Sequence, residues 1–223
     1  MKRNHLNCRG FFSAALSVLF LALVTSAQTV VPESPSSLSP QPLSAHQKFD
    51  VFLRYSYAPT NFLAAAASAG ISQAAGSTSG YGQGASGYGK RFGAELAGSE
   101  TGLFFSNFLL PTILHQDPRY FRRGTGGFFN RVWYAGTRAL VTRRDDGSPA
   151  LNTSVLMGTG ISAGLTNLYY PDADRGAIQT LGRYGAQLGG VASFNVLREF
   201  WGDVRGKVPR RHHRQPASSD ATQ

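Results

Sequence analysis

Glycines recur beside bulky apolar residues in the last third of this chain, and this pattern constrains the fold more than any other feature of the sequence. Each glycine inside a helix costs about 0.5–1 kcal/mol relative to alanine, so a helix that carries several must gain from a close approach of backbones. The segment 153–170, which Asn152 can cap, and the segment that follows Asp174 therefore predict closely packed helices. The expected helix-packing residues are Gly160, Gly164, Gly182, Gly185 and Gly189, beside bulky rows that include Met157, Ile161, Leu165, Leu181, Leu188 and Trp201.

Other segments carry helix or turn signals. Ser44 and Gln47 stand at the spacing of a capping box, before a helix that is expected to end near Pro59. Glycines over 76–93 predict a loop, and the sequence DDGSP predicts a turn. Further helices are expected over 61–75, over 103–114 with a kink or an end at Pro111, from Asp117-Pro118 over one short turn, and over 128–144.

These segments predict a mainly α fold, a bundle of about five to six helices with glycine-faced close packing and a Gly-rich loop. A β-rich outer-membrane barrel is the alternative, because 9 tyrosines, 15 phenylalanines and 26 glycines would suit one. Against the barrel, the chain lacks repeated segments of about ten residues with alternating polarity. No segment reaches the roughly 18 strongly apolar residues of a membrane-spanning helix either.

The N-terminal segment has the features of an export signal. A basic start is followed by the uncharged apolar run 11–24, and small residues precede a cleavage site expected between Ala27 and Gln28. Cys8, the only cysteine, lies within this segment, so the mature chain would form no disulfide. The expected organisation is a signal peptide over 1–27, a Pro/Ser-rich tether over 28–43, a helical domain over 44–206 and a basic polar tail over 207–223.

The chain is strongly basic while its charge density is low. Its formal net charge is +10, although charged residues make up only 15% of the sequence. An exported cationic protein is expected to meet a membrane or an anionic envelope polymer, and no nucleic acid partner is expected. Self-association into a homo-oligomer is a further expectation from the glycine rows. The sequence indicates no cofactor and no metal site.

Two motifs offer catalytic interpretations, and both are incomplete. The stretch GASGYGKR resembles a phosphate-binding loop, but Arg91 stands where the magnesium-binding Ser or Thr is required. The stretch GISAG fits the elbow that carries a serine nucleophile, here Ser162. The only histidines after it are His212 and His213, in the basic tail. An exported serine hydrolase therefore stays an alternative, whereas helix packing accounts for GISAG without any further residue.

The densest polar group of the expected domain is HQDPRYFRR. His115 and Asp117 could form an acid–base pair, and Arg119, Arg122 and Arg123 could bind an anion. The simpler interpretation is that Asp117 caps a helix and the arginines contact solvent or lipid headgroups. A soluble periplasmic module that binds an anion at these arginines is thus a third hypothesis.

Three segments resemble a family of uncharacterised exported bacterial proteins, found notably in soil acidobacteria. They are YGQGASGYGKRFGA, HQDPRYFRRG and NLYYPDADR, and the similarity covers most of 44–206. The resemblance implies an address in the cell envelope and no particular activity. The leading hypothesis is accordingly an exported, non-enzymatic envelope protein that associates with a membrane or with itself through glycine-faced helices.

Overall fold

The computed structural model describes residues 41–207, and this part of the chain is 72% helical. The mainly α prediction is therefore confirmed. The helices are α2 (Ala45–Ser56), α3 (Pro59–Ala74), α4 (Gly84–Phe104), α5 (Leu110–Ile113), α6 (Phe128–Thr137), α7 (Thr153–Leu165) and α8 (Ala177–Lys207), with short 3-10 turns at Ser79–Tyr81, Thr166–Leu168 and Asp172–Asp174.

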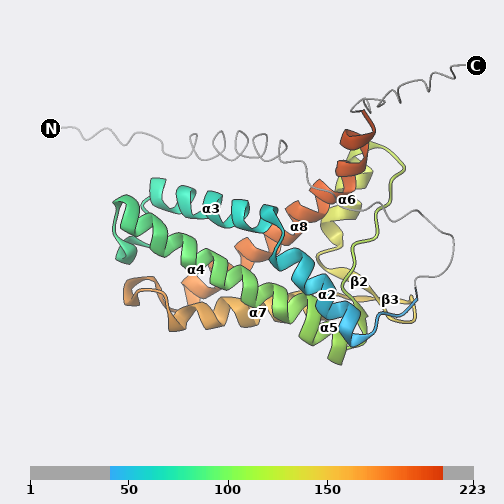
Figure 1. Cartoon of the computed structure of the whole chain (residues 1–223), viewed down its shortest axis with the longest axis horizontal. Helices are drawn as coiled ribbons and strands as arrows, with labels where there is room; N and C mark the ends of the chain where they lie inside the picture. The colour runs from blue at the N-terminus through green and yellow to red at the C-terminus, as the bar shows by residue number, and fades with distance from the viewer. Residues whose placement is uncertain (1–40, 208–223) are drawn as a thin grey trace, which may run out of the picture.

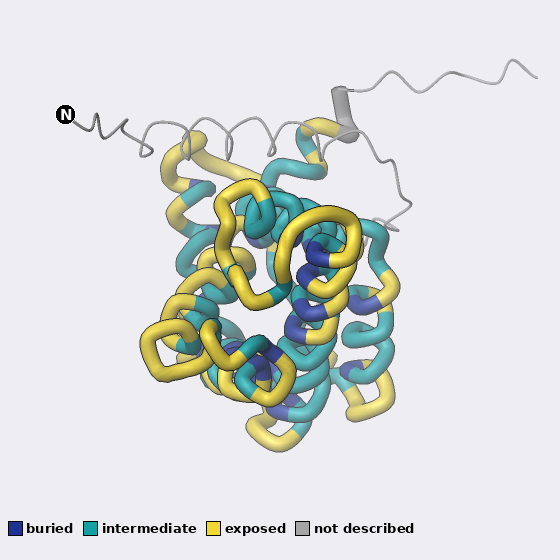
Figure 2. Tube along the Cα trace, turned by 90° about the vertical axis from the view of Figure 1, so that its left-hand side faces the viewer, coloured by how far each residue is buried: buried dark blue, intermediate teal, exposed yellow. Residues whose placement is uncertain are grey.

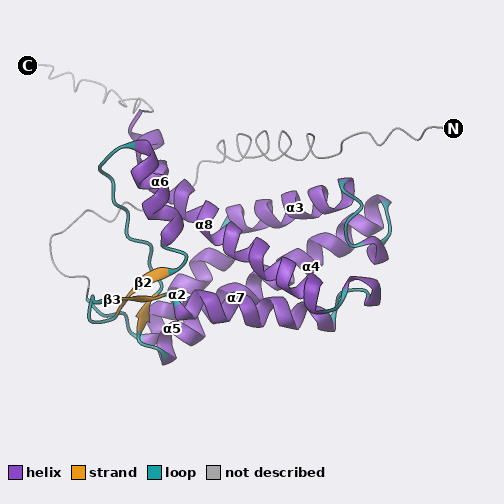
Figure 3. Ribbon diagram, turned by 180° about the vertical axis from the view of Figure 1, so that it is seen from behind, coloured by secondary structure: helices purple, strands orange, loops and turns teal. Residues whose placement is uncertain are grey.

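The long helices form a layered bundle with a small sheet at one end (Figures 1 and 3). Helix α3 packs on α4, α4 packs on α7, and α7 packs on α8. The far end of α8 carries α6, which lies apart from the α3, α4 and α7 layer (Figure 1). Figure 2 shows that buried positions are few and lie along the inward sides of the helices.

Local capping chemistry sets the start of two helices, as the sequence predicts. The Ser44 hydroxyl accepts a hydrogen bond from the backbone N–H of Gln47, and the Gln47 side chain accepts one from the N–H of Ser44. The Asn152 side chain accepts a hydrogen bond from the N–H of Val155 at the start of α7. Both caps satisfy N–H groups that have no partner inside the helix.

The Gly-rich segment is only partly a loop, so the expectation for 76–93 is wrong over its second half. Helix α4 begins at Gly84, because Arg91 reaches back along the chain and holds the turn before it. Its guanidinium donates to the carbonyl oxygens of Thr78 at 3.0 Å and Gly82 at 2.6 Å. Gly87 permits this turn, since a Cβ there would lie 2.8 Å from the carbonyl carbon of Gly82.

A three-stranded antiparallel sheet replaces part of the helix expected over 128–144. Helix α6 ends at Thr137, and the strand β2 (Val141–Arg144) takes the place of its expected last turns. In the sheet, β2 lies between β1 (Gln116–Asp117), which precedes α6 in the sequence, and β3 (Pro149–Leu151). Strand β2 pairs on both sides, so its hydrogen bonds go to segments distant in the sequence rather than to its own helix turn. The predicted DDGSP turn joins β2 to β3.

The chain from Pro118 to Gly127 is a loop without helix, so the short helix expected after Asp117 is wrong. The Asp117 carboxylate accepts from the backbone N–H of Arg119 at 2.9 Å, which forms a local turn instead of a helix cap. Upstream, α4 continues through a π-helical turn, Phe105–Leu109, into α5. The distortion of the helix thus lies two to six residues before Pro111, and Pro111 itself lies in the first turn of α5.

Candidate functional site

A small polar cavity of about 70 Å³ lies where the sheet, the π-helical turn, the start of α7 and the second half of α8 meet. Four arginines and one aspartate line it, so its walls are strongly cationic. Arg138 follows α6, Arg143 belongs to β2, and Arg198 belongs to α8. The remaining two charged residues are Asp117 and Arg119.

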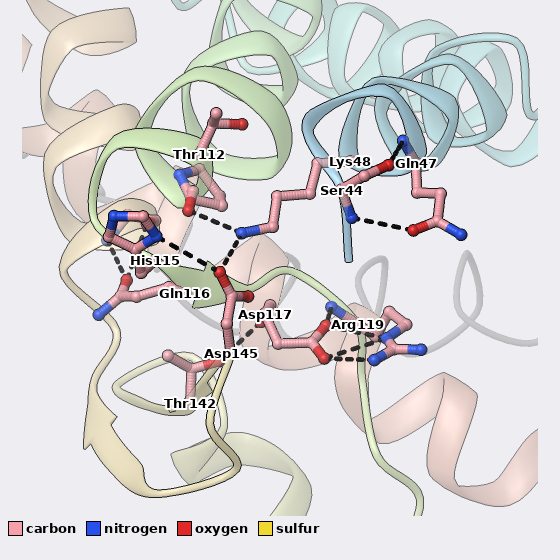
Figure 4. Close-up of polar contacts among 12 residues, drawn as sticks. Ser44, Gln47, Lys48, Thr112, His115, Gln116, Asp117, Arg119, Thr142 and Asp145 are labelled. Carbon is pink, nitrogen blue, oxygen red and sulfur yellow. Dashed lines mark hydrogen bonds and ion pairs between the residues drawn. The ribbon is translucent and has the colours of Figure 1, made fainter. Parts of the chain in front are cut away.

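The lining aspartate is already neutralised by its neighbour. Arg119 Nη2 donates to Asp117 Oδ2 at 2.6 Å, and Arg119 Nε donates to Oδ1 at 3.0 Å. Figure 4 shows the two side chains facing each other in this arrangement. Asp117 is buried, and the Thr142 hydroxyl fixes its backbone by donating to the carbonyl oxygen at 3.0 Å. The charge of the pair cancels, which leaves the other three arginines to set the charge of the cavity.

Those three arginines have aromatic neighbours in place of acidic ones. The Cζ atom of Arg138 lies 4.5 Å from the centre of the Tyr134 ring, and that of Arg143 lies 4.7 Å from the Phe121 ring. Within residues 41–207, none of Arg138, Arg143 and Arg198 forms an ion pair or a side-chain hydrogen bond. Stacking on a ring fixes the plane of a guanidinium while its N–H groups stay available for a ligand.

The third arginine is held in the same way from the other side of the cavity. Arg198 Cζ lies 4.2 Å from the Tyr55 ring of α2, and the Phe194 ring lies one turn earlier on α8. The Nε atom of Arg138 is buried and has no hydrogen-bond partner in the described residues. A buried N–H without a partner is costly, so this donor calls for an acceptor that the chain itself does not supply.

Uncharged polar groups complete the lining. Asn195 on α8 is 7% exposed, and its side chain makes no hydrogen bond within the described part of the chain. Asn107 reaches the cavity from the π-helical turn, a distortion that is frequent at functional sites. The N-terminus of α7 adds its positive helix dipole at Ser154. Donors therefore dominate the walls, and the cavity is suited to a small anion.

The sequence did not single out these arginines. The anion ligands expected from the sequence were Arg119, Arg122 and Arg123 instead. The sequence nevertheless contains a signal for two of the cavity arginines. An aromatic residue stands four positions earlier, Tyr134 before Arg138 at the end of α6 and Phe194 before Arg198 in α8. Residues four apart lie on one face of a helix, so such a pair predicts a stacked guanidinium.

The expected acid–base pair is not brought together. His115 lies outside the helices with a φ of 51°, and its neighbour is Asp145 rather than Asp117, with 3.8 Å between His115 Nδ1 and Asp145 Oδ2. The buried Lys48 donates to the same carboxylate oxygen at 2.7 Å and to the carbonyl oxygen of Pro111 at 3.0 Å. Figure 4 shows Lys48 and His115 on either side of Asp145. The group ties α2 to the end of α5 and to the sheet.

The other predicted anion ligands, Arg122 and Arg123, point to partners within the chain. Arg122 Nε donates to the carbonyl oxygen of Glu199 at 2.7 Å, and its Nη2 pairs with Asp203. Arg123 Nη1 donates to Asn130 Oδ1 at 3.0 Å. Together with the Arg119–Asp117 pair, these contacts separate the three arginines into different local interactions. An anion site made of Arg119, Arg122 and Arg123 stays an untested prediction.

Glu199 is the centre of a buried network that fastens the 118–127 loop and α6 to α8. Its side chain is fully buried. Oε1 accepts from Arg131 Nε and from the N–H of Gly124, both at 2.9 Å. Oε2 accepts from the Tyr120 hydroxyl at 2.8 Å and from the N–H of Arg123 at 2.9 Å. Because every oxygen is satisfied, we assign this group to structure.

The same network shifts several pKa values. Burial raises the pKa of Glu199, but the N–H groups of Gly124 and Arg123 and the Arg131 guanidinium outweigh it, so the net pKa lies below the usual value. Arg131, and to a lesser extent Arg122, also lower the pKa of Asp203. Burial, and then the Glu199 carboxylate, raise the pKa of Tyr120. The network therefore stays ionised at neutral pH.

Ser162 is fully buried between helices. Its hydroxyl donates to the carbonyl oxygen of Gly98 on α4 at 2.7 Å and accepts from Gln187 Nε2 of α8 at 3.4 Å. These contacts match the helix-packing interpretation of GISAG. His212 and His213, which a hydrolase would have required, lie outside the described residues.

The predicted packing glycines take different positions. Gly160 lies against the Tyr184 ring, where a Cβ would be 3.7 Å from the nearest ring carbon, while Gly164 has open space around it. Gly182, Gly185 and Gly189 are exposed on α8 with no atom within 4 Å of an added Cβ. The tightest glycine contact between helices involves Gly158 instead, where a Cβ would lie 2.8 Å from the Ser106 nitrogen.

The described residues 41–207 do not include the expected cleavage site between Ala27 and Gln28. None of the helices within 41–207 combines the length and hydropathy needed to cross a membrane. Over the same range, no three His, Cys, Asp or Glu side chains are grouped closely enough to hold a metal ion.

Comparison of the chain with protein-family models, with curated proteins and with solved structures finds no match.

Proposed function

We propose that this protein is an exported, non-enzymatic module that binds a small oxyanion, phosphate or sulfate, in the cavity between Arg138, Arg143 and Arg198. One observation carries the proposal: three guanidinium groups without an acidic partner in the described chain line the same polar cavity. A cationic group of this kind is stabilised when an anion enters, because the charges otherwise repel one another in a medium of low dielectric constant.

The number of donors favours a tetrahedral oxyanion over a carboxylate. A carboxylate offers two oxygens, whereas phosphate and sulfate offer four, and the cavity supplies three guanidinium groups from three separate elements. The amides of Asn107, in the π-helical turn, and of Asn195, on α8, add further donors. The aromatic rings that hold the guanidinium planes limit the side-chain entropy lost on binding, which strengthens each contact.

An address outside the cytoplasm is part of the proposal. It is supported by the basic start, the apolar run 11–24 and the small residues before Gln28. In that compartment the protein would hold an anionic nutrient or the anionic group of an envelope polymer. A non-enzymatic role is supported by the placement of Ser162 and His115, which have structural partners in the described chain.

The test is ligand-induced thermal stabilisation. Phosphate, sulfate, acetate and chloride are compared at equal ionic strength, because a ligand that binds only the folded chain raises its melting temperature with concentration. Phosphate or sulfate is expected to stabilise the wild type at concentrations where acetate and chloride do not. Each charge-assisted contact is worth about 1.5–3 kcal/mol, so Arg143→Gln or Arg198→Gln should weaken binding by about tenfold or more.

Arg144→Gln is the matched control for Arg143→Gln. The two arginines are neighbours on β2, but Arg144 is exposed and does not line the cavity. We expect the control to bind the oxyanion like the wild type. Equal stabilisation of all variants by all anions would show a general salt effect and would contradict the proposed site.

A further inference from the structure

Helix α6 exposes large aromatic side chains and buries a charged one. Phe129 is 83% exposed, Trp133 is 75% exposed and Phe128 is 62% exposed. The opposite face of this ten-residue helix buries Arg131, at 8% exposure, and Ala135. A surface helix of a water-soluble protein normally turns its apolar face toward the core.

The buried arginine explains why the helix cannot rotate its aromatic face inward. Arg131 Nε donates to Glu199 Oε1 at 2.9 Å, its Nη2 donates to the Glu199 carbonyl oxygen at 2.7 Å, and its Nη1 pairs with Asp203 at 2.6 Å. Its guanidinium also covers the Phe200 ring, with Cζ 4.4 Å from the ring centre. Rotation would leave Glu199 buried without its cation, which is strongly unfavourable.

The exposed rings form one continuous aromatic surface. The Phe128 and Phe129 rings are in contact, with centres 5.4 Å apart, and Phe128 also contacts Phe200. Val204, 43% exposed, adds an apolar side chain near the end of α8. Figure 1 shows α6 and the last turns of α8 projecting together beyond the bundle. We call Phe128, Phe129 and Trp133 the aromatic face.

The positive charge of the chain indicates which kind of surface the aromatic face would contact. The helix that packs along α6 is α8, and the sequence directly after α8 contains Arg210, Arg211 and Arg214 with no acid before Asp220. The whole chain has a net charge of +10. Exposed aromatic side chains on a cationic chain match the boundary between lipid headgroups and acyl chains. At about 1.5 Å per residue, α6 is about 15 Å long, so it would lie in that boundary rather than cross it.

We infer that the aromatic face of α6 docks on an anionic lipid bilayer, which the net positive charge of the chain favours. The inference is independent of the oxyanion cavity, whose ligand is measured in the absence of lipid. A second copy of the chain is the competing occupant of the face. It differs in that it would cover the face without lipid.

Vesicle binding tests the inference. The chain beginning at Gln28 is sedimented with vesicles of phosphatidylcholine alone and with vesicles that contain a third phosphatidylglycerol. We expect binding to the anionic vesicles, little binding to the neutral ones, and weaker binding at high salt. The double variant Phe129→Ser, Trp133→Ser should reduce binding by about tenfold or more, because it removes the two most exposed rings of the face.

Ile178→Ser with Leu181→Ser is the matched control, because both residues are as exposed as the aromatic face but lie at the start of α8, far along that helix from Phe200, which contacts Phe128. The control should bind like the wild type. Equal loss in both double variants, binding that ignores lipid charge, or a stable dimer without lipid that the Phe129 and Trp133 changes dissolve would each overturn the inference. Circular dichroism confirms that the variants remain folded.

Discussion

At the scale of single residues, the arginines of this protein fall into two groups that the structure separates by their partners. Arg119, Arg122 and Arg131 are held by carboxylates of the chain. Arg138 and Arg143 are held by aromatic rings and have no such carboxylate within the described residues. The first group maintains the fold, and the second is the group we assign to an external anion.

Glu199 is the residue on which the first group depends most. Replacing it with Leu leaves Arg131 buried without its main partner, and a broken buried ion pair typically costs about 3–5 kcal/mol. We therefore expect Glu199→Leu to lower the free energy of unfolding by several kcal/mol in urea titration. Tyr120→Phe removes one hydrogen bond to the same carboxylate and should cost less, about 1.5–3 kcal/mol. Similar effects of the two changes would contradict the central role of Glu199.

The lowered pKa of Glu199 predicts a pH dependence with a defined sign. A carboxyl group whose folded pKa lies below its usual value of 4.5 stabilises the fold fully above that value. Its contribution is lost as the pH falls through the folded pKa. Urea unfolding of the wild type and of Glu199→Gln should differ by a constant amount at neutral pH, and the difference should shrink below about pH 4.5. A difference that grows toward low pH would contradict the direction of this shift.

At the scale of secondary-structure elements, the sequence predicted what local chemistry determines. The Ser44 capping box and the Asn152 cap use residues within one helix turn, so they can be recognised in the sequence. The start of α4 at Gly84 and the strand β2 depend on distant contacts, the reach of Arg91 and the pairing of three strands. Their residues carry no local signal strong enough to compete with glycine content or helical periodicity.

The glycines give a prediction that separates packing from open space. Gly158→Ala should destabilise the protein, because its Cβ would lie 2.8 Å from the Ser106 nitrogen and force α7 away from the π-helical turn. Gly185→Ala should stabilise it by about 0.5–1 kcal/mol, because the position is helical, exposed and open. Thermal unfolding of the two variants measures both effects. Destabilisation by Gly185→Ala would indicate a close contact at that glycine, as the packing hypothesis for α8 requires.

At the scale of the whole molecule, several long polar side chains are buried while several large apolar ones are exposed. Lys48, Arg91 and Glu199 are buried, whereas Ile178 and Phe129 are more than four-fifths exposed. This distribution could not be predicted from the sequence, because periodicity shows which residues share a helix face but not which face turns inward. The oxyanion cavity was missed for a related reason: its walls come from elements up to 92 positions apart, from Ser106 to Arg198.

One fractionation experiment on whole cells tests both the export of the protein and its attachment to membranes. In cells that produce a C-terminally tagged chain, we expect a mature protein that starts at Gln28 by mass spectrometry. We expect membranes to release it partly in high salt and fully in alkaline carbonate, as for a protein bound by charge and by a shallow apolar face. A chain that keeps residues 1–27 and resists both washes would contradict this prediction.

The central claim is that an oxyanion binds among Arg138, Arg143 and Arg198, and anomalous diffraction from selenate-soaked crystals tests it most directly. Selenate has the shape and charge of sulfate, and selenium marks its position. The account predicts a selenium peak in the cavity, with the anion oxygens about 3 Å from N–H groups of all three arginines. At the same selenate concentration the peak should be weaker in Arg198→Gln crystals. Peaks confined to the exposed Arg122 and Arg123, with none in the cavity, would contradict it.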